Sequence, residues 1–331
     1  MDVPPPREPY PEIAPFDTRQ VAVGDGHVLY VEQVGNPDGS PALFLHGGPG
    51  SGCQPMHRQL FNPTRFRAVL LDQRGAGRSA PKGSRDANTT QHLIADLELV
   101  RRALAIERWL VVGGSWGATL AVAYAEAHPA RVSGVVLRGV FLGTRAEWRW
   151  AFVDAPRTFR PELFTAFANL VPPEERADVL AAMARRLRDP DPAVHVPAAA
   201  AWGDYERTLS EIRPEKTMPL PASLGVPMIV RAVPSTPYIE AHYYENHCFL
   251  RDGQLLAEAH RLAGIPAIIV QGRYDLLCPP AMAHALATAW PGCELRLVET
   301  AGHALTEPGM RPALIVAIED VARLGLPPAA P

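Results

Sequence analysis

A regular alternation of short buried strands and amphipathic helices is the feature that most constrains how this chain can fold. Four short, continuously apolar runs have the pattern of strands buried on both faces: residues 41–45, 66–71, 109–112 and 132–137. Helices are predicted between them, at residues 90–105, where leucine, isoleucine and valine recur every three or four positions, and at residues 117–127. This order predicts a mostly parallel sheet covered by helices.

The chain departs from this alternation at its start and again in its middle. Residues 19–24 and 27–34 read as strands joined by a Gly-Asp-Gly turn, which predicts an antiparallel hairpin at the start of the fold. The alternation stops near Phe141 and resumes with a strand at 265–270, a helix at 279–290, a strand at 294–298 and a last helix from about residue 308. The interruption is rich in proline and aromatic residues and predicts an inserted helical cap.

We therefore divide the chain into a first core part at residues 1–140, a cap at 141–260 and a second core part at 261–331. An insertion into a parallel sheet is expected to lie over the carboxyl ends of the strands, where such sheets bind ligands.

Composition argues against several classes of protein. Lys and Arg number 32 against 35 Asp and Glu, so the net charge of −3 provides no basic field for nucleic acid. The apolar runs are far shorter than the roughly 20 residues that cross a bilayer, and no membrane association is predicted. The N-terminus carries prolines and acids where a secretory signal has a basic start and an apolar run, so we expect a cytoplasmic location.

Neither a metal nor an organic cofactor is predicted. His242 and His247 lie five residues apart and would not share a helical face, and the four cysteines form no C-x-x-C pair. Gly75-x-Gly77-x-x-Ala80 follows a strand as a dinucleotide-binding loop does, but Pro81 and further loop residues stand where a long helix should begin.

Gly113-Gly-Ser115-Trp-Gly117 is the motif with the clearest chemical meaning. It joins the predicted strand at 109–112 to the predicted helix at 117–127, so a sharp turn would expose the Ser115 hydroxyl above the sheet. Such a serine needs a general base held by an acid. Asp275 follows the predicted strand at 265–270 and His303 follows the strand at 294–298, which gives the serine, acid and histidine in the chain order typical of this arrangement.

His46-Gly-Gly-Pro-Gly50 follows the predicted strand at 41–45 and can supply donors for an oxyanion. The backbone N–H of Gly47 or Gly48 is one expected donor, and the N–H of Trp116 is the second. We interpret His46 as a buried histidine that holds the glycine loop.

Together these motifs resemble the proline iminopeptidases, which are α/β-hydrolases that remove an N-terminal proline from peptides. The similarity extends over Asp72-Gln-Arg-Gly-Ala-Gly-Arg-Ser79, Gly272-Arg-Tyr-Asp275 and Gly302-His303 as well as the two glycine motifs. The resemblance implies an α/β-hydrolase fold with a mostly parallel central sheet and an inserted helical cap. It also implies a serine peptidase without cofactors whose substrates are peptides with a free N-terminal proline.

The resemblance further implies which residues bind substrate. Trp202-Gly-Asp-Tyr-Glu206 resembles the cap motif with a tryptophan and an amine-binding glutamate, and Glu245-Asn-His247 resembles the second acidic motif. Arg138-Gly-Val-Phe141 resembles the strand end that lines the proline ring site with an aromatic side chain. A protonated secondary amine would need such carboxylates.

The chain also departs from the family. Trp150-Ala-Phe152 stands where a tyrosine-rich segment is usual, and Cys248 follows His247 where an aromatic is common. We therefore include Phe152 among the residues that shape the ring pocket and expect the pocket to admit other small N-terminal residues. A broader aminopeptidase, an esterase or amidase on the same triad, and a non-catalytic binding protein are the alternatives.

Overall fold

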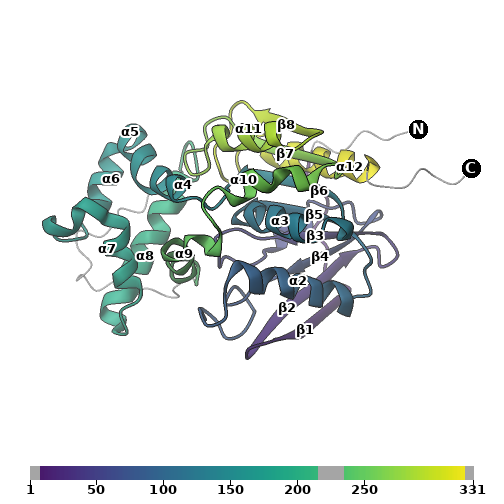
Figure 1. Cartoon of the computed structure of the whole chain (residues 1–331), viewed down its shortest axis with the longest axis horizontal. Coiled ribbons are helices and arrows are strands. Elements are labelled where there is room, and N and C mark those ends of the chain that lie inside the picture. Colours follow the sequence, from purple (N-terminus) through teal and green to yellow (C-terminus); the bar gives the residue numbers. More distant parts are fainter. Residues whose placement is uncertain (1–7, 215–234, 325–331) are drawn as a thin grey trace, which may run out of the picture.

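The computed structural model describes residues 8–214 and 235–324. Its centre is an eight-stranded sheet with the order β1-β2-β4-β3-β5-β6-β7-β8 (Figure 1). The strands are β1 (Asp17–Gly24), β2 (His27–Gly35), β3 (Ser40–Leu45), β4 (Phe66–Leu71), β5 (Trp109–Ser115), β6 (Val132–Val140), β7 (Ala267–Gly272) and β8 (Cys293–Val298). The expected α/β-hydrolase architecture is confirmed.

The sheet is antiparallel at one edge and parallel elsewhere. β2 pairs antiparallel with both β1 and β4, as the Gly-Asp-Gly turn indicated for the first hairpin. From β4 to β8 every neighbouring pair is parallel. The carboxyl ends of β3, β5, β7 and β8 therefore meet at one edge, which is where the sequence places its glycine loop, serine, acid and histidine.

Helices cover both faces of the sheet. The core helices are α1 (Pro55–Arg58), α2 (Thr90–Ala103), α3 (Trp116–Ala127), α10 (Gln254–Glu258), α11 (Pro280–Ala289) and α12 (Met310–Leu324), with single turns η1 (Pro129–Arg131) and η5 (Ala259–Leu262). Figure 1 shows α2, α3 and α10 on one face and α12 on the other.

Two apolar cores follow from the period-2 alternation of the strands. Leu43 and Leu45 point toward α2 and α3, whereas Phe44 points toward the face that α12 covers. α12 fits this second face because Leu314 and Ile318 recur at helical spacing. Thr89 accepts a hydrogen bond from the His92 N–H and thereby caps α2, which is worth about 1 kcal/mol.

The cap consists of helices inserted between the adjacent strands β6 and β7, and they stand to one side of the sheet in Figure 1. They are α4 (Arg145–Arg149), a π-helical turn η2 (Trp150–Asp154), α5 (Ala155–Phe159), α6 (Pro161–Ala168), η3 (Pro173–Asp178), α7 (Val179–Leu187), α8 (Pro192–Leu209), α9 (Thr236–Glu245) and η4 (His247–Phe249). The cap packs on itself through aromatic contacts such as the stacked rings of Phe167 and Tyr205.

The predicted domain boundaries can be compared with these elements. The first predicted boundary, at residue 140, coincides with the end of β6. α10 and the first half of η5 fall inside the predicted cap segment, but both elements pack against α3 and α11 of the core. Within residues 8–214 and 235–324, no helix combines the length and apolarity needed to span a bilayer.

Candidate active site

Ser115 lies at the sharp turn between β5 and α3. Its φ of 57° and ψ of −126° are strained for a residue with a side chain, as expected for a nucleophile held at such a turn. Glycine is required on both sides, because a Cβ on Gly117 would lie 2.1 Å from the Leu45 carbonyl oxygen and one on Gly113 would lie 2.2 Å from the Gly117 oxygen. The motif thus serves close backbone packing as well as exposure of the hydroxyl.

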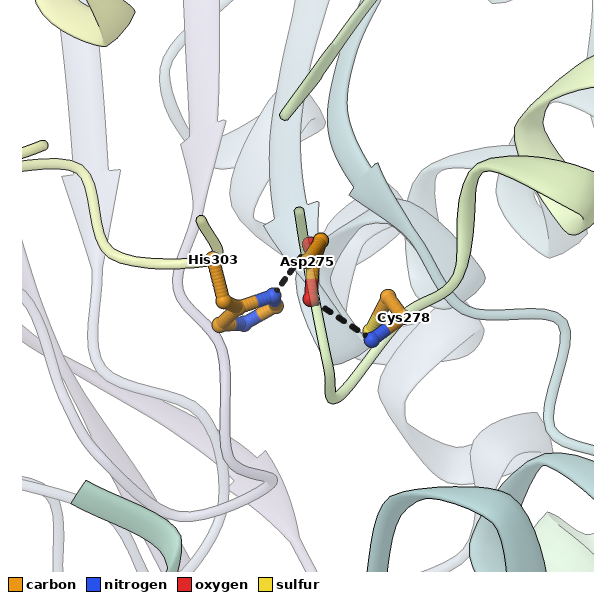
Figure 2. Close-up of side chains that lie close together, drawn as sticks. All are labelled: Asp275, Cys278 and His303. Atoms are coloured by element: carbon orange, nitrogen blue, oxygen red, sulfur yellow. Dashed lines mark hydrogen bonds and ion pairs between the residues drawn. The ribbon is translucent and has the colours of Figure 1, made fainter. Parts of the chain in front are cut away.

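Asp275 and His303 form a buried hydrogen-bonded pair on the loops after β7 and β8. Their Oδ2 and Nδ1 atoms lie 2.8 Å apart. Figure 2 marks this interaction with a dashed line. The other carboxylate oxygen of Asp275 accepts hydrogen bonds from the N–H groups of Leu277 at 3.0 Å and Cys278 at 2.8 Å. Asp275 is therefore fixed as an acceptor, and it orients the imidazole so that Nε2 is free to act as a base.

Gly139 lies against the Asp275–His303 pair and leaves room for it because it has no side chain. Its φ is +56°, and a Cβ there would lie 3.0 Å from His303 Cε1 and 3.3 Å from Asp275 Oδ2. Any larger residue at the end of β6 would press on the imidazole. The sequence analysis missed this role, although Gly139 lies beside the Arg138 and Phe141 that it singled out.

Arg138 supports the histidine from the core. Its guanidinium is buried, it donates a hydrogen bond to the His303 carbonyl oxygen, and burial lowers its pKa. It does not line the pocket at Ser115, where the resemblance predicted it to contribute to substrate binding. Its observed contact is with the loop that carries the base.

Cys278 lies beside Ser115 and lines the same pocket. Burial raises the pKa of its thiol well above the ordinary value, and the Ser115 contact opposes that shift only weakly. Among the described residues, no hydrogen bond joins Ser115 Oγ to the His303 imidazole. Catalytic hydrogen bonds of this kind often tighten only when substrate is bound.

Asp275, Cys278 and His303 also bring three potential metal ligands within 4.8 Å of one another. The arrangement is unsuited to a cation, because His303 Nδ1 is already paired with Asp275 and the buried thiol stays protonated. We assign the cluster to the acid and base pair.

The glycine loop after β3 passes directly beside the nucleophile. A Cβ on Gly47 would lie 3.3 Å from Ser115 Cβ and 3.8 Å from its Oγ, and Gly48 lines the same pocket with a φ of +105°. Trp116 is the first residue of α3, where backbone N–H groups lack acceptors within the helix. These are the positions expected of oxyanion donors, and the assignment of Gly47, Gly48 and Trp116 stays a prediction.

His46 holds this loop in place. Its Nε2 accepts the Gln73 N–H at 3.0 Å, and the Gln73 side chain in turn bonds the His46 carbonyl oxygen and the Trp116 indole. Burial lowers the pKa of His46, which keeps the imidazole neutral. The structural interpretation made from the sequence agrees with these contacts.

A largely apolar pocket opens beside Ser115 under the cap. Phe141 and Phe152 line it, as the sequence analysis expected, and Trp148 packs edge-on against Phe141 with ring centres 5.4 Å apart. The complete lining comprises Gly48, Ser115, Phe141, Glu147, Trp148, Ala151, Phe152, Glu206, Glu240, Leu277 and Cys278.

Two carboxyl groups of the cap meet in this pocket. Glu206 of α8 and Glu240 of α9 lie close together, and burial raises the pKa of both, with the charge of Glu206 raising that of Glu240 further. The Trp202 indole donates to Glu240 Oε2 at 2.7 Å, whereas Glu240 Oε1 is buried with no hydrogen-bond donor among residues 8–214 and 235–324. Glu240 Oε1 can therefore accept a hydrogen bond from a bound molecule.

The remaining predicted substrate residues have other contacts. Trp202 does not line the pocket, and it packs behind Phe152 with ring centres 4.7 Å apart. Glu245 forms a 3.0 Å ion pair with Arg188 and does not line the pocket, so the structure does not bring it together with Glu206.

Glu240 and Glu147 are the pocket carboxyl groups that the sequence analysis missed. Glu240 lies between Ile239 and Ala241, and all three are buried in α9, which only the packing of this helix reveals. Glu147 differs from Glu240 because its oxygens already accept the N–H groups of Leu142 and Thr144.

Comparison with known proteins agrees with this geometry. Residues 41–309 match the model of the α/β hydrolase fold family. A proline iminopeptidase of Xylella fastidiosa is 43% identical over 94% of this chain and 98% of its own, and one of Arabidopsis thaliana is 41% identical over 95% and 82%. The crystal structure of a proline iminopeptidase from Mycobacterium smegmatis covers 93% of this chain and 99% of its own with a TM-score of 0.63, and at 20% identity it supports the fold alone. The chain therefore belongs to the proline iminopeptidase family of α/β hydrolases.

Proposed function

We propose that the protein is a serine exopeptidase that releases N-terminal proline from peptides. The observation that carries this proposal is the pair of buried carboxyl groups, Glu206 and Glu240, that shares one pocket with Ser115. A general esterase has no use for unpaired negative charge at that point, whereas a substrate with a free cationic amine does. The membership of the family supports the same reading.

The proposed chemistry uses Ser115, His303 and Asp275. Ser115 Oγ attacks the carbonyl carbon of the first peptide bond while His303 Nε2 takes its proton, and Asp275 stabilises the imidazolium that forms. The N–H groups of Gly47 or Gly48 and Trp116 bind the oxyanion. His303 gives its proton to the leaving amine, and water then hydrolyses the prolyl ester by the same proton transfers in reverse order.

Recognition of the amine follows from the electrostatics of the pocket. A shared proton keeps the Glu206–Glu240 pair from carrying two full charges while the pocket is empty, since burial disfavours the second ionisation. A protonated proline nitrogen brings the missing positive charge and has two N–H donors, one for each carboxylate. Binding would therefore displace the shared proton and anchor the substrate at a fixed distance from Ser115.

The aromatic walls explain why the side chain would be a small ring. Phe141, Phe152 and Trp148 provide flat apolar surfaces in the pocket that Ser115 and the carboxyl pair also line, and such a pocket favours a compact apolar group. Discrimination against other small side chains is expected to be only about 10- to 200-fold, because it depends on one or two methylene contacts.

Prolyl-anilide and N-acetyl-prolyl-anilide provide the test. The free amine form should be hydrolysed and the acetylated form should not, because acetylation removes both the positive charge and the donors. Ser115→Ala should abolish turnover and keep the circular dichroism spectrum of the native protein. Equal rates on the two anilides would replace the proposal with a broad esterase or amidase, and a fully active Ser115→Ala would refute the nucleophile.

Two further expectations from the sequence stay predictions. They are the absence of nucleic-acid and membrane partners and the cytoplasmic location.

A further inference from the structure

The loop that carries His303 is fastened to the cap at the end of α8. The Ser210 carbonyl oxygen, at the C-terminal cap of this helix, accepts the N–H groups of His303 at 3.0 Å and Ala304 at 2.8 Å. Both donors belong to the core, while the acceptor belongs to the cap. The backbone of the catalytic base is thus bonded directly to a cap helix.

Glu307 adds a second connection at the same place. Its Oε1 accepts the N–H of Ile212 at 3.1 Å, and its Oε2 accepts the N–H of Gly302 at 3.2 Å. One carboxylate therefore bridges the segment after α8 and the residue that precedes His303. The contact is close, since a Cβ on Gly302 would lie 3.3 Å from both Ile212 Cγ1 and the Ser210 oxygen.

The cap helix involved is the one that carries Glu206. Glu206 lies four residues before Ser210, one helical turn away, so the amine site and the His303 loop are attached to the two ends of a single turn of α8. From the opposite side, Arg138 bonds the His303 carbonyl and Asp275 bonds the ring. Core and cap contacts together determine where the imidazole lies.

We infer that Glu307 is a positioning residue that couples the cap to the catalytic histidine. This inference rests on the proposed function, because it assigns His303 as the base. Glu307 does not line the pocket at Ser115 and touches no reacting atom there. It acts by joining two backbone segments through hydrogen bonds to a charged acceptor, which are stronger than those to a neutral one.

Removal of the Glu307 carboxylate is expected to lower kcat. Without the carboxylate, two N–H groups lose their acceptor and the loop from Gly302 to Ala304 gains freedom relative to α8. A displacement of about 1 Å in a catalytic group can cost 100-fold in rate. Glu307→Ala should lower kcat on prolyl-anilide by roughly 10- to 100-fold and leave KM within about twofold, because the amine site and the ring pocket are unchanged.

The experiment compares Glu307→Ala and Glu307→Gln with Glu299→Ala as the matched control. Glu299 lies four residues before His303 as Glu307 lies four after, but it is exposed and, within the described part of the chain, pairs with Arg273 of the core. The concentration of competent sites is measured by titrating Ser115 with a fluorophosphonate, and kcat is expressed per titrated site. The rate of that phosphonylation is a second readout, because it needs His303 but not the amine site.

The inference predicts a graded order, in which Glu307→Gln keeps one acceptor and loses less activity than Glu307→Ala, while Glu299→Ala matches the wild type. A normal kcat per site and normal phosphonylation in both Glu307 variants would overturn it, even if their melting temperatures fell. If Glu307→Ala does not fold, Glu307→Gln decides. His303→Ala tests the catalytic role of His303 separately from the positioning role of Glu307. An active His303→Ala would refute the proposed function itself.

Discussion

The core and the cap build their parts of the site in different ways. In the core, Ser115, Asp275 and His303 follow the ends of β5, β7 and β8, and the pairing of the strands decides how close they come. In the cap, Glu206 and Glu240 belong to two helices, α8 and α9, whose side-chain packing decides which residues point inward. Positions fixed by a sheet can be read from strand ends, whereas positions fixed by helix packing cannot.

The largest expected effect lies in the core. Asp275→Asn would replace the acceptor for His303 Nδ1–H with a group that can also donate, which favours the wrong tautomer of the imidazole. We expect kcat to fall by about 10⁴-fold on prolyl-anilide and equally on an uncharged ester, because the core serves every substrate. Steady-state kinetics on both substrates checks this. A loss of activity confined to prolyl-anilide would contradict the proposal that the core residues serve every substrate and that only the cap residues recognise the amine.

A cap substitution should affect only the cationic substrate. Glu240→Gln removes the charge that lies beside Glu206, and we expect kcat/KM on prolyl-anilide to fall by about 2–5 kcal/mol, or roughly 30- to 4,000-fold. The uncharged ester should be hydrolysed normally. Glu245→Gln, on the same helix but ion-paired with Arg188, is the matched control and should change kcat/KM less than threefold. If the two variants exchanged these outcomes, the amine site would belong to Glu245 as the sequence motif indicated.

The pH dependence of KM gives a smaller effect. Because burial raises the pKa of Glu206 and Glu240, their protonated forms persist to higher pH than those of exposed carboxyl groups, and lowering the pH removes the remaining negative charge. KM for prolyl-anilide should therefore rise as the pH falls from 8 to 5.5, by about tenfold per pH unit at most. Glu240→Gln should flatten this dependence. A flat KM in the wild-type protein would mean that the pair does not bind the amine.

The smallest effect concerns stability and returns to the core. Burial, together with the charge of Glu258, raises the pKa of Glu126 to about 8, and one of its oxygens has no hydrogen-bond partner among the residues that the structure describes. Its ordinary value is 4.5, so between pH 4.5 and 8 the folded protein keeps a proton that the unfolded chain releases, and the free energy of unfolding falls as the pH rises.

Glu126→Gln cannot ionise and should lose that slope. We expect a melting temperature roughly 5 °C above the wild type at pH 8 and almost no difference at pH 4.5, measured by thermal unfolding. The exposed Glu162→Gln on α6 is the control, with no change at either pH. Parallel stability curves for wild type and Glu126→Gln would show that the buried carboxyl group does not govern this dependence.

The sequence predicted the core closely because its signals are local. The strand from Phe66 to Leu71 was predicted residue for residue, and the helix that begins at Thr90 was predicted from its first residue. The places of Ser115, Asp275 and His303 after β5, β7 and β8 followed from strand ends in the same way, while their roles in catalysis stay predictions. The position of Glu240 depended instead on Trp202, 38 residues earlier, which donates a hydrogen bond to it. No pattern along the chain encodes that contact.

Arg138 illustrates the same limit within the core. Its place at the end of β6 was evident from the sequence, but its partner is the carbonyl of His303, 165 residues later. The direction in which a long side chain extends depends on which loop lies nearby, and that loop is specified elsewhere in the chain.

The insertion of the cap between two neighbouring strands has a consequence for protein engineering. Since β6 and β7 pair directly, a foreign lid could be grafted between them without altering the hydrogen-bond register of the sheet. Such a chimera would nevertheless need to bring a carbonyl group to the place of Ser210, because the His303 loop takes part of its support from there. Lids without an equivalent turn would produce well-folded proteins with slow chemistry, so the segment at residues 210–212, between α8 and α9, is the one to retain.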